Sequence, residues 1–357
     1  MRKLLLNLHL WAGLIAGVFL ILLSVTGSFM VFEDEIDRAL NPKLTWATPR
    51  EKRLSLTEMK SGLEEKYPGR TVVSFSISPR SDLAWGATLQ SNSPQDPLNV
   101  AFDQFTGDVL GTDSDRNHFV GFVHDFHLRL MMGETGGTIA SLVAVLLLFL
   151  SLSGIILWWP RKLSTVSWRS QIKELNFELH QSLGIYVSLF LMIFAITAIV
   201  IHWENEATQL ANRISGSAAL PSPPRPQPLT PNTPTLSPDR LLSIAESAAP
   251  GAHATWILLV GNPVRIAMKY PEDRTPSGRT NIFIDAYSGV VLYNQNSRTG
   301  PLGYRMVKLW NREIHTGDIG GLPTRILVCA LSLTLPVMAI TGPFIWWNRR
   351  QQKPKSR

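Results

Sequence analysis

Four long apolar blocks constrain the fold of this chain more than any other feature of its sequence. Their interiors hold no Lys, Arg, Asp or Glu apart from Arg325 at the start of the fourth block. Because about 20 apolar residues of helix cross a bilayer, each block predicts a transmembrane helix. The first block is too long for the apolar region of a signal peptide, and no small-x-small cleavage site ends it, so we expect an uncleaved anchor. The blocks are 4–32, 138–159, 183–203 with a less apolar lead-in from Asn176, and 323–347.

The net charge of +7 is concentrated in the short segments beside these blocks. The positive-inside rule therefore places both termini and the 161–175 loop in the cytoplasm. The two long segments then lie on the other side, which in a Gram-negative cell is the periplasm. Membrane topology accounts for the excess positive charge. We therefore expect the chain to contact the lipid bilayer and not to bind nucleic acid. The basic residues concerned are Arg2, Lys3, Arg161, Lys162, Arg169, Lys173, Arg349, Arg350, Lys353, Lys355 and Arg357.

The two halves of the chain repeat one another. One constant offset in sequence number matches His9 with His180, Gly13 with Gly184, Thr26 with Thr197 and Glu33 with Glu204. A second, slightly larger offset matches His127 with His315, Gly154 with Gly342, and Trp158–Trp159 with Trp346–Trp347. Both halves begin on the same side of the membrane, which predicts two parallel repeats related by a pseudo-two-fold axis along the membrane normal.

Two similar segments lie between the helices. Each has a helical run that ends in Pro-Gly, several strand-like stretches, and an Asp-x-x-[Ser/Thr]-Gly motif that begins at Asp103 or Asp285. The motif between β-rich runs is typical of a hairpin turn. We therefore expect two α+β domains, each with one helix on a small antiparallel sheet. The strand-like stretches are 71–77, 83–89 and 98–102 in the first segment, and 255–260, 264–269 and 281–284 in the second.

These features predict the following domain order: 1–32, first transmembrane helix; 33–137, first periplasmic domain with a pre-helix segment; 138–160, second helix; 161–175, cytoplasmic loop; 176–203, third helix; 204–322, proline-rich linker and second periplasmic domain; 323–347, fourth helix; 348–357, cytoplasmic tail. Eight of the eighteen residues from 221 to 238 are proline, which favours an extended spacer. The single cysteine, Cys329, excludes a disulfide within one chain and a thiolate metal site, and we expect it to serve packing.

Several motifs together resemble a known family. They are Leu8-His9 with Gly13 and Thr26-Gly27, the two Asp-x-x-[Ser/Thr]-Gly motifs, Ser153-Gly154 before Trp158-Trp159-Pro160-Arg161, and Thr341-Gly342 before Trp346-Trp347. In these features the chain resembles the PepSY-associated transmembrane family of iron-regulated bacterial membrane proteins, along nearly its whole length. The resemblance implies a membrane α-helical fold of four transmembrane helices with two periplasmic PepSY-like domains. It also implies kinship with inner-membrane ferric-siderophore reductases that bind b-type haem.

Four of the eight histidines lie at matching positions and at predictable depths. His9 and His180 stand near the cytoplasmic starts of the first and third helices, and His127 and His315 precede the outer starts of the second and fourth. Each pair is expected to face its partner across the axis, as the two axial ligands of a haem iron do. We therefore predict two b-type haems, with iron held through His9 with His180 and through His127 with His315. His124 and His202 are secondary candidates.

Small residues follow the inner histidines on the same helix face, namely Gly13 and Gly17 after His9, and Gly184 and Ser188 after His180. They would give a porphyrin room beside the backbone. The residues alone also fit plainer roles: interfacial histidines, glycines for close helix packing, tryptophans as membrane anchors, or a proton relay. Glu33 and Glu204 fit either a bound cation or basic siderophore, or solvated acids beyond a helix end. His118 and His253 are expected to be ordinary histidines of the outer domains.

The leading hypothesis is an electron carrier that reduces ferric-siderophore iron in the periplasm. Because no G-x-G-x-x-G or other nucleotide motif occurs, the electron donor would be a membrane quinol or a separate reductase. The alternative is a membrane-anchored binding or regulatory module for a peptide, protease or siderophore. A permease is the third hypothesis, although four helices are few for one and no pair of broken helices is evident. Pro336 and Pro343 would kink the fourth helix.

Overall fold

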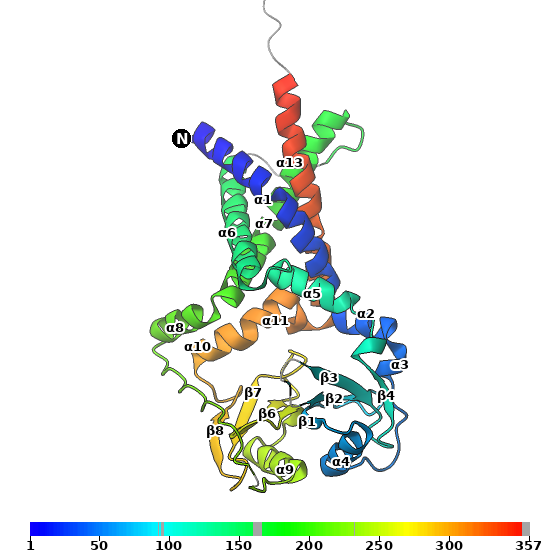
Figure 1. Cartoon of the computed structure of the whole chain (residues 1–357). Helices are drawn as coiled ribbons and strands as arrows, with labels where there is room; N and C mark the ends of the chain where they lie inside the picture. Colours follow the sequence, from blue (N-terminus) through cyan, green and yellow to red (C-terminus); the bar gives the residue numbers. More distant parts are fainter. Residues whose placement is uncertain (92, 94–95, 160–165, 232, 352–357) are drawn as a thin grey trace, which may run out of the picture. The chain divides into compact units, whose positions relative to one another are not determined.

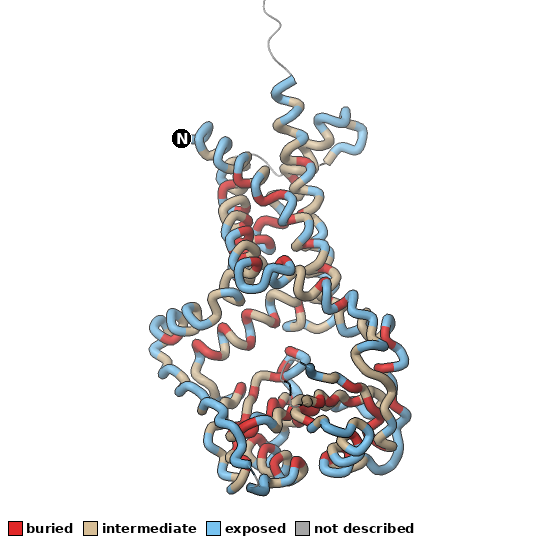
Figure 2. Tube along the Cα trace, in the orientation of Figure 1, coloured by how far each residue is buried: buried red, intermediate tan, exposed pale blue. Residues whose placement is uncertain are grey.

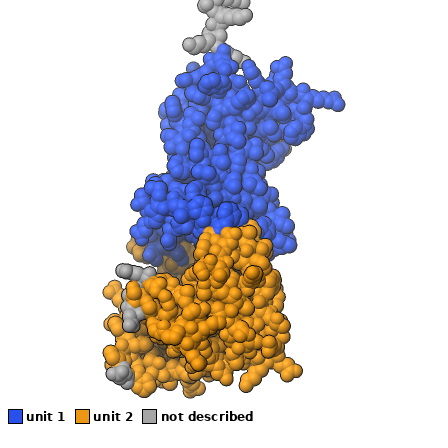
Figure 3. Space-filling view, turned by 45° about the vertical axis from the view of Figure 1, so that its right-hand side comes forward, with its two compact units in different colours: residues 1–33, 119–207, 310–357 blue, residues 34–118, 208–309 orange. Residues whose placement is uncertain are grey.

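A computed structural model describes residues 1–91, 93, 96–159, 166–231 and 233–351 (Figure 1). The chain divides into two compact units, shown in different colours in Figure 3. The helical unit comprises residues 1–33, 119–207 and 310–357, and the sheet unit comprises residues 34–118 and 208–309. Of the basic residues used to predict topology, Arg161, Lys162, Lys353, Lys355 and Arg357 lie outside the described residues.

The four apolar blocks form helices that are long and apolar enough to cross a membrane. The fourth is interrupted at Leu333, because Pro336 cannot donate a hydrogen bond in the first turn of the helix that follows. The elements of the helical unit are α1 (Arg2–Met30), α5 (Phe119–Arg129), α6 (Gly133–Trp158), α7 (Ile172–His202), α11 (Asn311–Thr316), η3 (Asp318–Gly320), α12 (Leu322–Ser332) and α13 (Thr334–Gln351). Three elements continue from one unit into the other: α2 (Glu33–Leu40), α8 (Glu204–Ser215) and the π-helix η2 (Arg305–Trp310).

The spanning helices form a bundle in which α1 and α7 lie diagonally, because each of them packs against both α6 and α13. Small residues bring the backbones close, as expected for helix association in lipid. Ala16 and Ala195 have no exposed surface, and a Cβ on Gly17 would lie 3.9 Å from the Cβ of Ala339. The buried positions lie along the inner sides of the helices (Figure 2). The apolar centre of the bundle consists of Ala16, Leu20, Val143, Leu147, Val187, Leu191, Ala195 and Leu335.

The sheet unit contains one antiparallel sheet of eight strands, in the order β4-β3-β2-β1-β5-β6-β7-β8. Each of the two chain segments supplies four strands, and β1 pairs with β5 to join them. The sequence predicts a small sheet in each segment, but it did not predict this junction. The strands are β1 (Thr71–Ser76), β2 (Trp85–Gln90), β3 (Pro97–Phe102), β4 (Val109–Thr112), β5 (His253–Leu258), β6 (Val264–Lys269), β7 (Thr280–Ile284) and β8 (Val291–Gln295). The remaining elements are α3 (Pro42–Thr45), α4 (Leu56–Lys66), η1 (Asp113–Asp115), α9 (Pro238–Ala248) and α10 (Leu302–Tyr304).

Helices α4 and α9 cover one face of the sheet and enclose its core. Alternate strand residues point into this core, among them Phe75, Ile257 and Ile266, which have no exposed surface. The N-termini of the two helices meet at Asp239, whose carboxylate accepts hydrogen bonds from the backbone N–H groups of Leu56 (2.8 Å) and Thr57 (3.0 Å). A carboxylate there offsets the partial positive charge of the helix ends.

Both Asp-x-x-[Ser/Thr]-Gly motifs form the predicted hairpin turns. Asp103 accepts the backbone N–H of Phe105 (2.7 Å), and Asp285 accepts those of Tyr287 (3.1 Å) and Ser288 (2.7 Å). The glycine that ends each motif has a positive φ, 78° at Gly107 and 76° at Gly289, as a tight turn of this kind requires. The turns place β4 and β8 beside β3 and β7 at the two edges of the sheet.

Candidate functional site

Two histidines lie near the starts of the diagonal helices α1 and α7, and each contacts a hydroxyl group on a neighbouring helix. Nδ1 of His9 is 2.8 Å from Oγ of Ser153 on α6, and Nδ1 of His180 is 2.8 Å from Oγ1 of Thr341 on α13. The two imidazoles are close enough to interact electrostatically. The structure thus brings the predicted inner pair together at one level of the bundle.

Glycines stand directly behind both rings of the inner pair. A Cβ on Gly154 would lie 3.6 Å from Cε1 of His9, and a Cβ on Gly342 would lie 3.3 Å from Cε1 of His180. Each glycine follows the hydroxyl residue that binds the histidine. In both dipeptides the first residue binds the imidazole and the second lies against the ring, with a tighter fit at Gly342 than at Gly154.

The outer pair makes the same kind of contact at the other ends of α1 and α7. Nδ1 of His127 on α5 is 3.1 Å from Oγ1 of Thr26, and a Cβ on Gly27 would lie 2.7 Å from the Cε1 atom of the same histidine. Nδ1 of His315 on α11 is 2.7 Å from Oγ1 of Thr197. These two histidines are also close enough to interact electrostatically. The structure thus brings the predicted outer pair together at a second level.

Tight turns hold the short helices that carry the outer pair. Helix α5 ends in two left-handed residues, Leu130 (φ 49°) and Met131 (φ 58°), and doubles back against α6. A Cβ on Gly136 would lie only 1.6 Å from the carbonyl oxygen of Arg129, so glycine is required there. Helix α11 ends at Thr316 and is capped by Gly317 (φ 81°), whose carbonyl oxygen accepts a hydrogen bond from the hydroxyl of Thr324. Backbone geometry therefore fixes where both outer histidines lie.

The hydroxyl partners determine which nitrogen of each imidazole carries the proton. Every one of the four hydroxyls already donates to the carbonyl oxygen four residues earlier in its own helix, so it can only accept a bond from the histidine. Nδ1 therefore holds the proton, and the lone pair lies on Nε2. The hydroxyl contacts of these four histidines all involve Nδ1 and not Nε2. The hydroxyl-to-carbonyl distances are Ser153–Phe149 2.6 Å, Thr341–Val337 2.7 Å, Thr26–Leu22 2.8 Å and Thr197–Ile193 2.7 Å.

Burial keeps the outer histidines neutral. Burial is the largest influence on both, and it lowers the pKa of His127 to about 4 and that of His315 to about 3. Both rings are therefore uncharged at neutral pH. A neutral imidazole with its lone pair on Nε2 is a metal ligand, whereas a protonated one is not.

The sequence also matches a known family along almost its whole length. The family model described as PepSY-associated TM region matches residues 6–349. The chain belongs to this family. The match confirms the resemblance predicted from the motifs, and it covers all four histidines and their hydroxyl partners. No curated protein matches the sequence.

The secondary candidates in this PepSY-associated protein have other contacts. Nδ1 of His124 is hydrogen-bonded to Oε2 of Glu33 (2.7 Å). Nε2 of His202 is 3.5 Å from the hydroxyl of Thr138, and its ring packs edge-on against Trp203. Glu204, the repeat partner of Glu33, begins α8. His118 and His253 lie in the sheet unit, outside the helical bundle.

The predicted small residues face neighbouring helices. A Cβ on Gly13 would lie 3.8 Å from Leu150 of α6, and one on Gly184 would lie 3.1 Å from the methyl group of Met338 of α13. Gly13 and Gly184 thus lie against side chains of neighbouring helices. The residues that stand against the histidine rings are Gly27, Gly154 and Gly342, which were not among the predicted site residues. The sequence indicated two of these glycines, because Gly154 and Gly342 match across the repeat and each follows a hydroxyl residue.

The donor set of this PepSY-associated protein fits b-type haem. Each level offers two imidazole side chains, which is the number of axial protein ligands that a low-spin haem iron takes. The hydroxyl partners fix the ring orientations, as hydrogen bonds to metal-ligating histidines commonly do. Within the described ranges, no group of three or more His, Cys, Asp or Glu side chains could hold a metal ion.

Proposed function

We propose that this PepSY-associated protein is a haem-containing electron carrier of a bacterial inner membrane that reduces ferric-siderophore iron in the periplasm. The observation that carries the proposal is the set of four histidine–hydroxyl contacts, two at each of two levels. One such contact would be an ordinary polar pair at a helix end. Four histidine–hydroxyl contacts that all use Nδ1 and that match in repeat position support a common role.

The equivalence of these contacts also supports two parallel repeats. The offset that relates α1 to α7 carries His9 onto His180 and Thr26 onto Thr197. The larger offset carries Ser153 onto Thr341 and His127 onto His315, so each histidine keeps its partner. With both termini and the 161–175 loop in the cytoplasm, the inner pair would lie on the cytoplasmic side, and the sheet unit would lie in the periplasm.

The chemistry divides between the protein and the proposed cofactor. A haem bound at each level would supply one-electron transfer. The histidines would bind it through Nε2, and the serine and threonine hydroxyls would hold the Nδ1 protons, which orients the imidazoles. His9 and Thr26 mark the two levels on α1, and the helical rise between them is about 25 Å. Between them lies the apolar centre of the bundle, which bars water and ions from the path.

Electrons would enter at the inner level and leave at the outer one. The donor is a membrane quinol or a separate reductase, because the sequence holds no nucleotide-binding motif. One electron passed to the chelated ferric ion yields the ferrous ion. Hard oxygen donors hold ferrous iron less tightly than ferric iron, so reduction releases the metal from its siderophore.

The experiment that tests this function measures electron delivery. Purified protein is reduced with dithionite, freed of excess reductant, and mixed with a ferric-siderophore chelate in the presence of a ferrous-specific dye. We expect the haem absorption to reoxidise while the ferrous–dye complex forms. His315→Ala should slow both signals, and His118→Ala, in the sheet unit, should leave them unchanged. A reduced protein that the chelate fails to oxidise would refute the proposed activity.

A further inference from the structure

The sheet has a second face, opposite the face that α4 and α9 cover. Residues paired across an antiparallel sheet share a face, so the strand registers define the rows of side chains there. One row runs Asn99, Thr88, Ser74, Leu258, Arg265, Phe283, Tyr293. The next row runs Ala101, Gly86, Ser76, Trp256, Ala267, Asn281, Gln295.

The centre of this face carries one large aromatic ring among small residues. Trp256 is flanked in its row by Ser76 on one side and Ala267 on the other, and Gly86 follows Ser76. Trp256 is half-buried, and Ser76 is exposed. The neighbours of Trp256 in its row are small, and part of the indole remains exposed. We call Trp256, Ser76, Gly86 and Ala267, together with Arg265, the Trp256 platform.

Arg265 supplies a positive charge to the platform. Its guanidinium lies over the Trp256 ring, 5.6 Å from the ring centroid, and its Nε donates to Oδ1 of Asn281 (2.9 Å). Asn281 in turn donates to Gln295 (3.1 Å), which holds the amide in place. In the described part of the chain, Arg265 forms no ion pair with a carboxylate. Burial lowers the pKa of this arginine, with Tyr304 nearby acting in the opposite direction.

The first half of the sheet carries a different polar row. Oγ1 of Thr88 donates to Asn99 (2.7 Å), and Asn99 donates to Oδ2 of Asp113 (2.5 Å). Asn99 and Asn281 lie four residues before their hairpin aspartates, Asp103 and Asp285. Equivalent asparagines therefore hold an acid in one half and a cation in the other. The face is electrically asymmetric, and its positive end is the one that carries Trp256.

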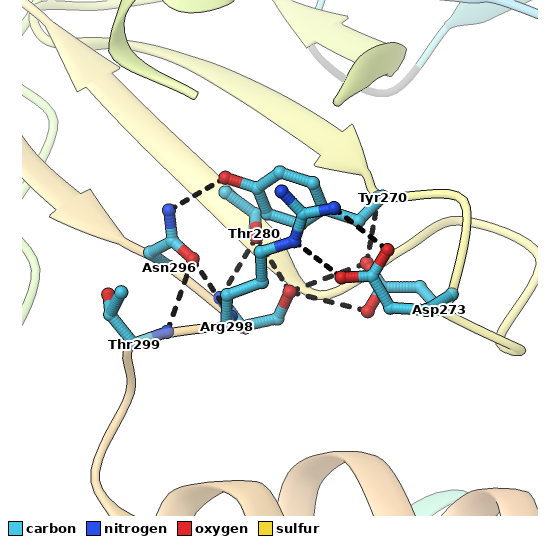
Figure 4. A network of polar contacts seen from close by, with 8 residues as sticks. Tyr270, Asp273, Thr280, Asn296, Arg298 and Thr299 are labelled. Carbon is cyan, nitrogen blue, oxygen red and sulfur yellow. Dashed lines mark hydrogen bonds and ion pairs between the residues drawn. The ribbon is translucent and has the colours of Figure 1, made fainter. Parts of the chain in front are cut away.

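A polar network links the connection between β6 and β7 to the segment that follows β8 (Figure 4). The guanidinium of Arg298 lies over the ring of Tyr270, 3.7 Å from its centroid, and forms an ion pair with Glu272. Asp273 accepts the backbone N–H of Tyr270 (3.0 Å) and the hydroxyl of Ser297. The connection is tied to the end of β8, so the strands that carry Arg265 and Asn281 are held in register.

We propose that the Trp256 platform binds an anionic ferric chelate that carries aromatic rings, of the tris-catecholate class. The aromatic rings pack against the exposed part of the indole, and the guanidinium of Arg265 attracts the negative charge of the chelate. A neutral chelate lacks this attraction. The inference rests on the proposed function, because it names the class of substrate that the sheet unit would hold for reduction.

The test is a binding titration on the full-length protein in detergent. The probe is a synthetic ferric tris-catecholate, and a neutral ferric tris-hydroxamate serves for comparison. Arg265→Gln should weaken binding of the anionic chelate about 10- to 100-fold, the loss expected for one charge-assisted contact, and should barely change binding of the neutral one. Trp256→Leu should also weaken binding of the anionic chelate. Arg265→Lys, which keeps the charge but not the planar stacking group, should fall between wild type and Arg265→Gln.

Arg80→Gln is the matched control, because Arg80 is an exposed arginine of the sheet unit that is paired with Asp82 (2.6 Å). An unchanged affinity in Arg265→Gln, an equal loss in Arg80→Gln, or equal wild-type affinity for the two chelates would overturn the inference. Haem absorption is recorded on the same samples. A protein without haem that still binds the chelate through Arg265 would refute the proposed function and leave the platform standing. Full haem reduction without selective chelate binding would refute the platform and leave the proposed function standing.

Discussion

A methyl group added at Gly27 should disturb the outer histidine level and leave the inner level intact. Gly27 follows Thr26, whose hydroxyl binds His127. A Cβ at this position would lie 2.7 Å from Cε1 of His127 and 3.5 Å from Nε2, the atom proposed as a haem ligand. The ring would have to move by about 0.7 Å to regain an ordinary contact distance.

That displacement sets the size of the effect. The bond between Nδ1 of His127 and the Thr26 hydroxyl is already 3.1 Å long, and a shift of this size takes it beyond about 3.5 Å, where a hydrogen bond is lost. Overpacking of a tight site costs about 1–3 kcal/mol. This corresponds to roughly 5- to 150-fold weaker retention of a group held by His127.

The assay is a redox titration of purified Gly27→Ala, followed by haem absorption. We expect the outer component to be depleted or shifted in potential, while the inner one keeps its wild-type behaviour. Gly154→Ala is the matched control, because its Cβ would meet Cε1 of His9 at an ordinary 3.6 Å. Two wild-type components in Gly27→Ala, together with the loss of one in Gly154→Ala, would refute the steric reasoning.

Three further predictions follow from single contacts. Ser153→Ala should weaken haem retention at the inner level about 10- to 100-fold. Thr341→Val should weaken it less, because the carbonyl oxygen of Met338 also contacts the His180 ring. Equal losses in the two variants, measured by haem titration, would contradict this reasoning. Asp239→Ala should destabilise the start of α4 by about 1–2 kcal/mol, measured as faster amide hydrogen exchange. Asp239→Asn keeps a hydrogen-bond acceptor, so its loss of stability should be smaller. Unchanged exchange in both variants would disprove the capping role. Hydrogen bonds lower the pKa of Asp285 to about 2 from its ordinary 3.8, chiefly the bond from the Asn262 side chain and then those from Ser288. The ionised carboxylate therefore stabilises the fold above pH 4, and this contribution is lost as the pH falls toward 2. Asp285→Asn should flatten the pH dependence of thermal unfolding in that window, and a wild-type slope would contradict the assignment.

Hydrophobic patterning predicted the membrane helices because their requirements are local. A bilayer demands a continuous apolar run, and the four helices begin and end within a few residues of the predicted blocks. The helices extend further at their polar ends, as at Ile172, because backbone hydrogen bonding continues past the apolar stretch. The strands and the two hairpin turns were likewise predictable from alternation and from turn residues.

The pairing of β1 with β5 was not predictable in this way. Phe75 pairs with Ile257, which lies in the other half of the chain, and no local pattern specifies which open edge meets which. Both strands read as ordinary half-buried strands. The proline-rich linker is a similar case, since Gln227 exchanges two backbone hydrogen bonds with Asn262 of the β5–β6 turn, and composition predicted only an extended spacer.

For the candidate site, the repeat predicted which histidines share a level, and the structure places His9 near His180 and His127 near His315. The hydroxyl partners were missed because each lies on another helix, far from its histidine in the sequence, as Ser153 does from His9. Matching each histidine to the hydroxyl residues that repeat with it would have suggested these contacts.

The haem content of the purified protein tests the central claim most directly. Protein from cells with adequate haem, measured as a dithionite-reduced minus oxidised spectrum against protein concentration, should hold two b-type haems per chain. His180→Ala should lose the inner one, His315→Ala the outer one, and His253→Ala neither. Protein without b-type haem bands, or with two haems per chain in all three variants, would contradict the account.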